Sequence, residues 1–119
     1  MAERKTIDEV IAGHEARNAS LRRVFSQKQI DLMEPRRIEC HFWTRSRKGA
    51  TELGEALKTR GFEILRQNRA ATRGDAGQWN LEAAVRQSID LTIRREFTDE
   101  LVKLADSHGG VYDGWGTSV

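Results

Sequence analysis

Cys40 and His41 are the neighbouring residues with the clearest potential for chemistry, because thiolate and imidazole groups ligate metals and act as nucleophile and base. Cys40 is the only cysteine, and the other histidines, His14 and His108, lie far away in the sequence. Adjacent residues of a strand point to opposite faces, so a strand here would separate the two side chains. No Ser or Cys lies in a nucleophile-elbow pattern. We therefore expect no metal site, no cofactor and no catalysis.

A glycine-containing segment at residues 72–77 is the one candidate for a phosphate-binding loop. It contains Arg73-Gly74-Asp75-Ala76-Gly77, which lacks both the lysine and the spacing of a P-loop. Gly and Asp at these positions are typical of turns. The segment therefore predicts the turn of a hairpin.

His41 and Trp43 alternate with apolar residues, and basic residues flank them on both sides. The flanking residues are Arg36, Arg37, Arg45, Arg47 and Lys48. Aromatic side chains with basic neighbours on a sheet are how RNA recognition domains stack bases. An RNA recognition signature is absent, and we favour the interpretation that Trp43 packs under the N-terminal helix. A partner-binding role for His41, Trp43, Arg36 and Arg37 stays open beside it.

The last residues hold two aromatic side chains where most domains fray. The run is Tyr112-Asp113-Gly114-Trp115-Gly116-Thr117-Ser118-Val119. Tyr and Trp have large apolar faces and one polar group each, so the segment is expected to dock on the core. Residues 112–116 are therefore predicted either to tie down the terminus or to bind a partner.

Hydrophobic periodicity predicts the elements that position these residues. Apolar residues recur at three and four residue steps in the expected helices and at every second position in the expected strands. Gly114 and Gly116 would weaken the last strand and indicate a bend or bulge there. The expected elements are a helix from Thr6 to about Phe25, a strand over 36–44, a helix between Ser46 and Gly61, strands over 62–69 and 79–87, a helix capped by Asp90 or Thr92, and a strand over 111–115.

This order is a helix followed by β-α-β-β-α-β, which is the ferredoxin-like arrangement. We predict an α+β sandwich with a four-stranded antiparallel sheet, helices on one face and an extra N-terminal helix. A length of 119 residues fits one domain over residues 1–119. Within it, residues 1–34 form the N-terminal helix and linker, and residues 35–119 form the ferredoxin-like core.

Charge is distributed unevenly, although the net charge is only +2. Residues 17–73 contain fourteen Lys and Arg against six Asp and Glu, whereas residues 90–119 contain three against six. A basic stretch attracts nucleic acid or an acidic protein surface, and a solvated surface explains it equally well. The lone cysteine and the lack of a signal peptide or membrane-spanning run predict a soluble cytoplasmic protein. Oligomeric state stays open.

The chain resembles a known family, the bacterial ribonuclease E activity regulator B family. The terminal aromatic motif carries most of the resemblance, which covers about residues 21–119. The matching residues are Tyr112-Asp113-Gly114-Trp115-Gly116-Thr117 after Leu104-Ala105 and Gly109-Gly110, Pro35-Arg36 before Ile38-Glu39-Cys40-His41-Phe42, and Leu57 with Gly61-Phe62-Glu63-Ile64. The resemblance implies a ferredoxin-like fold and a non-catalytic protein that binds the scaffold region of the endoribonuclease in the RNA degradosome, inhibiting RNA cleavage and altering the partners of the complex.

One departure concerns charge. Well-known members resembling this chain are acidic and have an acidic tail after the aromatic motif, whereas this sequence has a pI of about 9.0 and no such tail. We therefore expect different docking electrostatics. Three hypotheses follow: a protein-binding regulator of an RNA-processing enzyme, a small RNA-binding module that uses the basic middle and the sheet face, or an inhibitor of another target.

Overall fold

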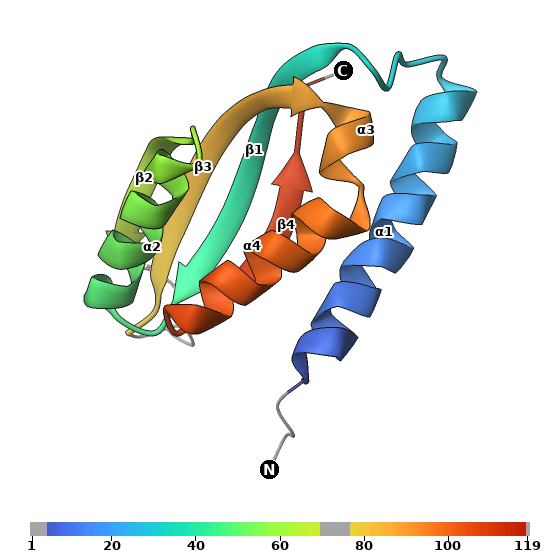
Figure 1. The fold of residues 1–119 in the computed structure, drawn as a ribbon. Coiled ribbons are helices and arrows are strands. Elements are labelled where there is room, and N and C mark those ends of the chain that lie inside the picture. Colours follow the sequence, from blue (N-terminus) through green and yellow to red (C-terminus); the bar gives the residue numbers. More distant parts are fainter. Residues whose placement is uncertain (1–4, 70–76, 119) are drawn as a thin grey trace.

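The computed structural model describes residues 5–69 and 77–118, in which four strands form one antiparallel sheet in the order β2-β3-β1-β4 (Figure 1). The strand order and the chain order after the first helix confirm the predicted ferredoxin-like α+β fold. The elements are α1 (Ile7–Gln27), β1 (Pro35–Thr44), α2 (Arg47–Thr59), β2 (Glu63–Arg69), β3 (Trp79–Ser88), α3 (Ile89–Thr92), α4 (Arg95–Ser107) and β4 (Gly110–Gly116).

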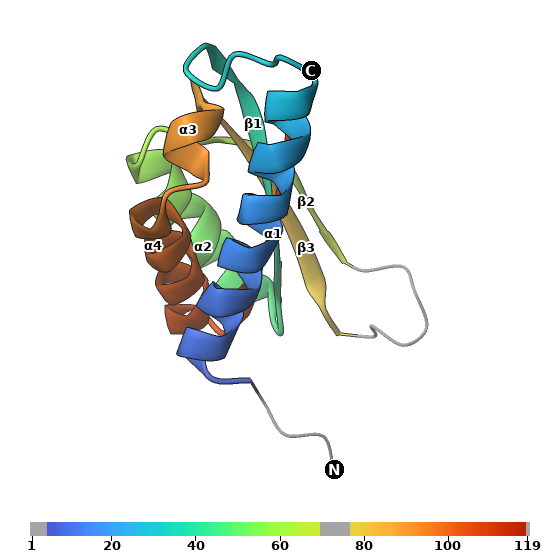
Figure 2. The same ribbon diagram turned by 90° about the vertical axis from the view of Figure 1, so that its right-hand side faces the viewer.

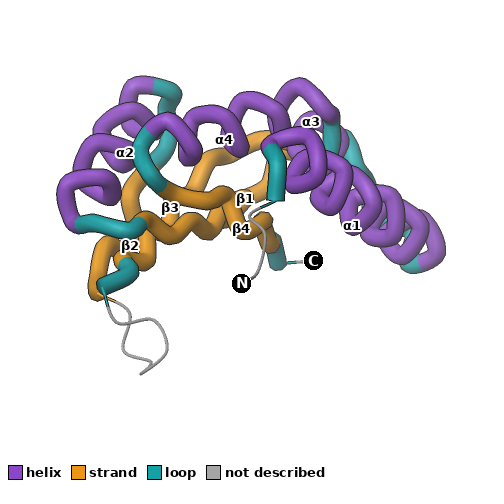
Figure 3. The backbone as a smooth tube through the Cα atoms, turned by 90° about the horizontal axis from the view of Figure 1, so that it is seen from below, coloured by secondary structure: helices purple, strands orange, loops and turns teal. Residues whose placement is uncertain are grey.

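In the part of the chain that the structure describes, helices cover one face of the sheet. α2, α3 and α4 lie together on that face (Figure 2), and α1 runs beside α4 at the β4 side of the sheet (Figure 3). The opposite face, here called the open face, has no helix over it in the described ranges. None of the helices in these ranges has the length and apolar character needed to cross a membrane.

The core lies between the sheet and the helices because β1 alternates in the predicted way. Ile38, Cys40 and Phe42 are buried, whereas Glu39 and His41 between them are partly exposed. β3 pairs with β1 in register and contributes its own buried residues, among them Leu81 opposite Phe42. Full burial of one such side chain stabilises the fold by about 1.5–3 kcal/mol.

α1 begins at the predicted capping box. The Thr6 hydroxyl accepts a hydrogen bond from the backbone N–H of Glu9 at 3.1 Å, and the Glu9 carboxylate accepts one from the backbone N–H of Thr6. The helix continues two residues beyond the predicted end at Phe25. One side of α1 carries the residues that face the domain, at alternating steps of four and three: Ile7, Ile11, His14, Asn18, Leu21 and Phe25.

The predicted start of the last long helix was wrong. Asp90 and Thr92 lie inside α3, a four-residue helix whose cap is Ser88, because the Ser88 hydroxyl accepts from the N–H of Leu91 at 3.1 Å. The chain then takes an extended conformation at Arg94 before α4 begins without a side-chain cap. A single apolar stripe over both helices concealed this break.

The predicted hairpin between the second and third strands is confirmed, because β2 pairs antiparallel with β3. The predicted turn at residues 72–77 lies outside the described residues except for Gly77. The stop of α2 at Gly61 is also confirmed: Gly61 has φ +90°, and a left-handed residue at this place is typical of a helix end.

Candidate functional site

β1 and β4 lie next to each other in the sheet and together carry every candidate residue that the sequence indicated. Their register places His41 opposite Gly114, Glu39 opposite Gly116 and Trp43 opposite Val111. These residues alternate with the buried core positions, so they belong to the open face. We call this surface the β1–β4 face; its residues are Arg37, Glu39, His41, Trp43, Val111, Gly114 and Gly116.

Gly116 leaves part of this surface uncovered. It contributes no side chain beside Glu39, and the His41 side chain retains 41% of its accessible area. Gly114, opposite His41, is buried, and the guanidinium of Arg17 from α1 lies against it. The Nδ1 of His41 lies 3.3 Å from Glu82 of β3, whose other oxygen lies 3.7 Å from Arg66 of β2. The β1–β4 face is therefore an accessible surface with an imidazole in a mixed charge network.

The charged side chains within this surface, Arg37 and Glu39, pair with each other. Arg37 lies 3.6 Å from Glu39, and both side chains are about half exposed. Exposed ion pairs of this kind each contribute roughly 0–1 kcal/mol to stability and reduce the local net charge. The electrostatic field of the β1–β4 face is consequently weaker than the basic composition of residues 17–73 suggests.

Trp43 lies at one end of the β1–β4 face and not beneath α1, so the favoured sequence interpretation was wrong. Its neighbours in β1, Phe42 and Thr44, point into the core, and Trp43 itself is half-buried on the open face. The guanidinium of Arg45 lies 5.6 Å from the centre of the indole, a cation–π distance. Because strand residues alternate between the two faces of the sheet, the burial of Phe42 and Thr44 places Trp43 on the face that the helices do not cover.

A β-bulge shapes the terminal aromatic motif. The register of β4 against β1 shifts between His41 and Phe42, so that Asp113 has no partner residue in β1. Residues three apart normally point to opposite faces of a strand, but the extra residue lets Tyr112 and Trp115 both point into the core. They are 2% and 4% exposed, respectively. The bulge anticipated from the two glycines is confirmed.

Trp115 joins β4 to α1. Its indole Nε1 donates to the Asn18 Oδ1 at 2.9 Å, and its ring lies 6.3 Å from that of Phe25. Asn18 is 5% exposed and also donates to the Thr98 hydroxyl at 3.5 Å. A buried polar pair of this kind is costly to break, because each partner would lose its hydrogen bond away from water.

The backbone of β4 is held by two further side chains of α1. His14 Nε2 lies 2.9 Å from the carbonyl oxygen of Tyr112, and Arg17 donates to the carbonyl oxygen of Trp115 at 3.4 Å. Because a carbonyl only accepts, the His14 nitrogen is the donor. The His14 ring also stacks on the Tyr112 ring, with centroids 4.8 Å apart. α1 thereby covers an edge strand that would otherwise expose hydrogen-bonding groups.

The candidate residues thus divide by position. His41, Trp43, Arg37 and Gly116 are partly or fully exposed on the β1–β4 face, Gly114 is buried within it, and Asp113 is exposed at the bulge. Tyr112 and Trp115 are buried beneath it. Arg36 alternates to the helix side, where its guanidinium donates to the Ser118 carbonyl oxygen at 3.5 Å and to Glu34 at 3.2 Å.

Sequence reasoning missed Asn18 and Arg17, two of the α1 residues that hold the terminal motif. Asn18 occupies a position of the α1 stripe at which apolar residues are expected, four after His14. A polar residue within a buried stripe indicates a specific hydrogen-bond partner in the core. That signal was present in the sequence, although it did not identify Trp115 as the partner.

Cys40 and His41 separate as predicted, with Cys40 buried in the core and His41 on the open face. Burial raises the pKa of the Cys40 thiol to about 12. The thiol is therefore protonated at neutral pH and is not the reactive thiolate form. Within residues 5–69 and 77–118, no three His, Cys, Asp or Glu side chains gather closely enough to hold a metal ion.

His14 makes the stability of the fold depend on pH. Burial lowers the pKa of His14 below 6.5, an effect that the bond to the Tyr112 carbonyl and the charge of Asp113 oppose and that Arg17 reinforces. The unfolded chain therefore takes up the proton before the folded chain does. We expect the free energy of unfolding to fall as pH drops below 6.5, until the lower pKa of the folded state is passed.

The variant H14Q is expected to weaken this dependence, because glutamine can donate to the same carbonyl without titrating. Urea unfolding of wild type and H14Q, at pH values from about 7.5 down to about 5, measures the difference. This range brackets the ordinary pKa of a histidine side chain. Parallel stability curves for the two proteins over this range would contradict the assignment.

The family model described as Regulator of ribonuclease activity B matches residues 15–117. The match includes the whole β1–β4 face and both Arg17 and Asn18 of α1. No curated protein sequence matches the chain significantly.

Proposed function

Because the chain belongs to the regulator of ribonuclease activity B family, we propose that it binds a ribonuclease and lowers its RNA-cleaving activity without catalysing a reaction itself. The partner proposed is endoribonuclease E, through the scaffold region that organises the degradosome, in keeping with the sequence resemblance. Binding there also alters which proteins the complex holds.

The open β1–β4 face is the observation that supports a binding role most directly. It presents Trp43, His41 and Arg37, residue types that are enriched among the energetically dominant contacts of protein interfaces or that form charge-assisted hydrogen bonds. We propose that the partner contacts the exposed residues of this face together with Asp113, whereas the buried Gly114 supports the bulge. Tyr112 and Trp115 act as positioning residues from beneath, and Arg36 anchors the start of β1.

Association through this surface depends more on contact than on long-range charge. Arg37 pairs with Glu39, and Glu82 lies close to both His41 and Arg66, so much of the local charge is already compensated. Because these pairs reduce the net field, steering by the surface is weak, and the affinity is expected to fall less with salt than binding through many phosphate contacts would. This agrees with the expectation from the sequence that the chain docks with different electrostatics from the acidic members of the family.

Replacing Trp43 by alanine is expected to weaken binding to endoribonuclease E by about 30-fold, equivalent to about 2 kcal/mol for a central aromatic contact. Titration calorimetry with the purified scaffold region measures the affinity. W79A is the matched control, because Trp79 is also half-buried and carries a stacked arginine, Arg47, at 5.8 Å. Trp79 pairs with Thr44, on the helix side of the sheet. Equal losses in W43A and W79A would contradict the proposed surface.

Binding of single-stranded RNA is the alternative function, and the same tryptophan favours it. Trp43 with Arg45 and Arg37 offers an aromatic platform and cations on an uncovered sheet. Phosphate contacts make affinity fall steeply with salt, so the two proposals differ in a simple measurement. Fluorescence anisotropy with a labelled single-stranded RNA at low salt tests this alternative, which fails if no binding is seen there.

A further inference from the structure

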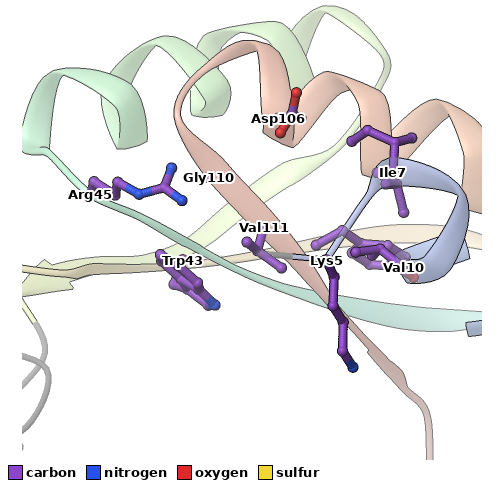
Figure 4. Close-up of a pocket in the computed structure, with 10 residues that line it drawn as sticks. Lys5, Ile7, Val10, Trp43, Arg45, Asp106, Gly110 and Val111 are labelled. Carbon is purple, nitrogen blue, oxygen red and sulfur yellow. The ribbon is translucent and has the colours of Figure 1, made fainter. Parts of the chain in front are cut away.

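A pocket of about 240 Å³ opens beside the Trp43 end of the β1–β4 face (Figure 4). Three segments distant in sequence form it: the start of α1, the end of α4 with the start of β4, and the end of β1. The lining residues are Lys5, Ile7, Val10, Trp43, Arg45, Val102, Asp106, Gly110, Val111 and Tyr112. Because Trp43 and Val111 belong both to the pocket lining and to the β1–β4 face, the pocket is continuous with the proposed binding surface.

The pocket wall is mostly apolar and its charged residues are mainly basic. Val10, Val102 and Val111 contribute aliphatic surface from three different elements. Arg45 is held in place by its hydrogen bond to the Gly109 carbonyl oxygen at 3.1 Å and by its position over the Trp43 ring. Neither Arg45 nor Lys5 forms an ion pair with a described residue. Among the described residues of the wall, Asp106 is the one acidic residue.

The volume limits what the pocket can hold. An apolar cavity of about 150 Å³ accommodates benzene, so this pocket has room for one aromatic or branched aliphatic side chain. Pockets for drug-sized ligands and cofactors are usually about 300–1,000 Å³. The pocket therefore fits a single anchoring side chain better than a whole cofactor.

We propose that this pocket receives an apolar anchor side chain of the ribonuclease, next to an acidic residue whose carboxylate contacts Arg45 and Lys5. The inference rests on the proposed function and specifies the partner segment: a large apolar residue with an acidic neighbour. Anchors that fill preformed pockets contribute most of the energy in many interfaces. Arg45 and Lys5 have no ion-pair partner among the described residues, so a partner segment with an acidic residue beside the anchor is favoured by charge complementarity.

A small probe tests the pocket without the ribonuclease. 3-Phenylpropionate combines an aromatic ring with a carboxylate, and its neutral amide has the same ring. In an amide-detected NMR titration of the whole chain, we expect the acid to bind in the millimolar range and to shift the resonances of Val10, Gly110 and Val111. The variant R45Q should reduce the preference for acid over amide about threefold. R47Q, which removes an arginine outside the pocket lining, should not. No shifts at these residues would overturn the proposal.

A filling substitution tests the anchor in the complex. V10F places a larger side chain in the pocket and should weaken binding to endoribonuclease E at least tenfold, because the anchor would be displaced. V24F is the matched control on the same helix, since Val24 is 41% exposed and outside the pocket lining. Circular dichroism checks that both variants fold. If V10F binds as tightly as wild type, the proposal that an anchor side chain occupies the pocket is contradicted, and the proposed function stands. Absence of binding by the wild type would contradict the proposed function itself.

Discussion

Replacing Trp115 by alanine is expected to lower the free energy of unfolding by about 3–5 kcal/mol, the usual range for truncation of a buried tryptophan. The indole is 4% exposed, packs near Phe25 and donates to Asn18. Its removal leaves a cavity between β4 and α1 and a buried amide oxygen without its donor. Urea unfolding monitored by circular dichroism measures the change.

Two further variants separate the contributions. W115F keeps an aromatic ring and removes the N–H, so its loss should be about 1–3 kcal/mol, the cost of an unsatisfied buried partner. D113A changes an exposed residue two positions away and should alter stability by no more than about 0.5 kcal/mol. A small effect of W115A, comparable to that of D113A, would show that α1 does not depend on this tryptophan.

Replacing Gly114 by alanine is the second large change, with an expected loss of about 1–3 kcal/mol from backbone strain alone. Gly114 has φ +119°, a conformation that side chains other than glycine rarely adopt. A Cβ atom there would also approach Arg17 Nη1, so the arginine must move away from its bond to the Trp115 carbonyl oxygen. Thermal or urea unfolding measures the loss.

Gly116 provides the control for this prediction. It lies two residues further along the same strand without a positive φ, and no atom comes within 4 Å of an added Cβ. G116A should therefore change stability by less than about 1 kcal/mol. The double variant R17A/G114A removes the close contact but keeps the strain, so it should still be clearly less stable than R17A alone. Equal stabilities of G114A and G116A would contradict the strained conformation.

The fold was predictable from sequence because its signals are local and consistent. Thr6 and Glu9 predicted the start of α1, and the alternation of Ile38, Cys40 and Phe42 predicted β1. Antiparallel pairing of the hairpin and the order of elements then led to the ferredoxin-like sheet. The break between α3 and α4 was missed because one apolar stripe continues through both helices.

The site was less predictable because its contacts are distant in sequence. Trp115 and Asn18 are separated by 97 residues, and nothing local pairs them. Trp43 was assigned to the wrong surroundings, since which face of β1 the helices cover depends on the whole topology. The pocket is likewise assembled from three segments that no sequence pattern connects. The terminal aromatic motif, by contrast, was correctly expected to dock, and its burial explains how α1 is held to the sheet edge.

The central claim, that the β1–β4 face regulates a ribonuclease, is tested most directly by RNA cleavage. Purified endoribonuclease E with its scaffold region is incubated with a labelled RNA substrate and increasing amounts of wild type, the H41A/W43A double variant or W79A. We predict that wild type and W79A slow cleavage equally and that H41A/W43A, folded by circular dichroism, requires at least tenfold more protein for the same effect. Inhibition by H41A/W43A at wild-type concentrations would contradict the claim.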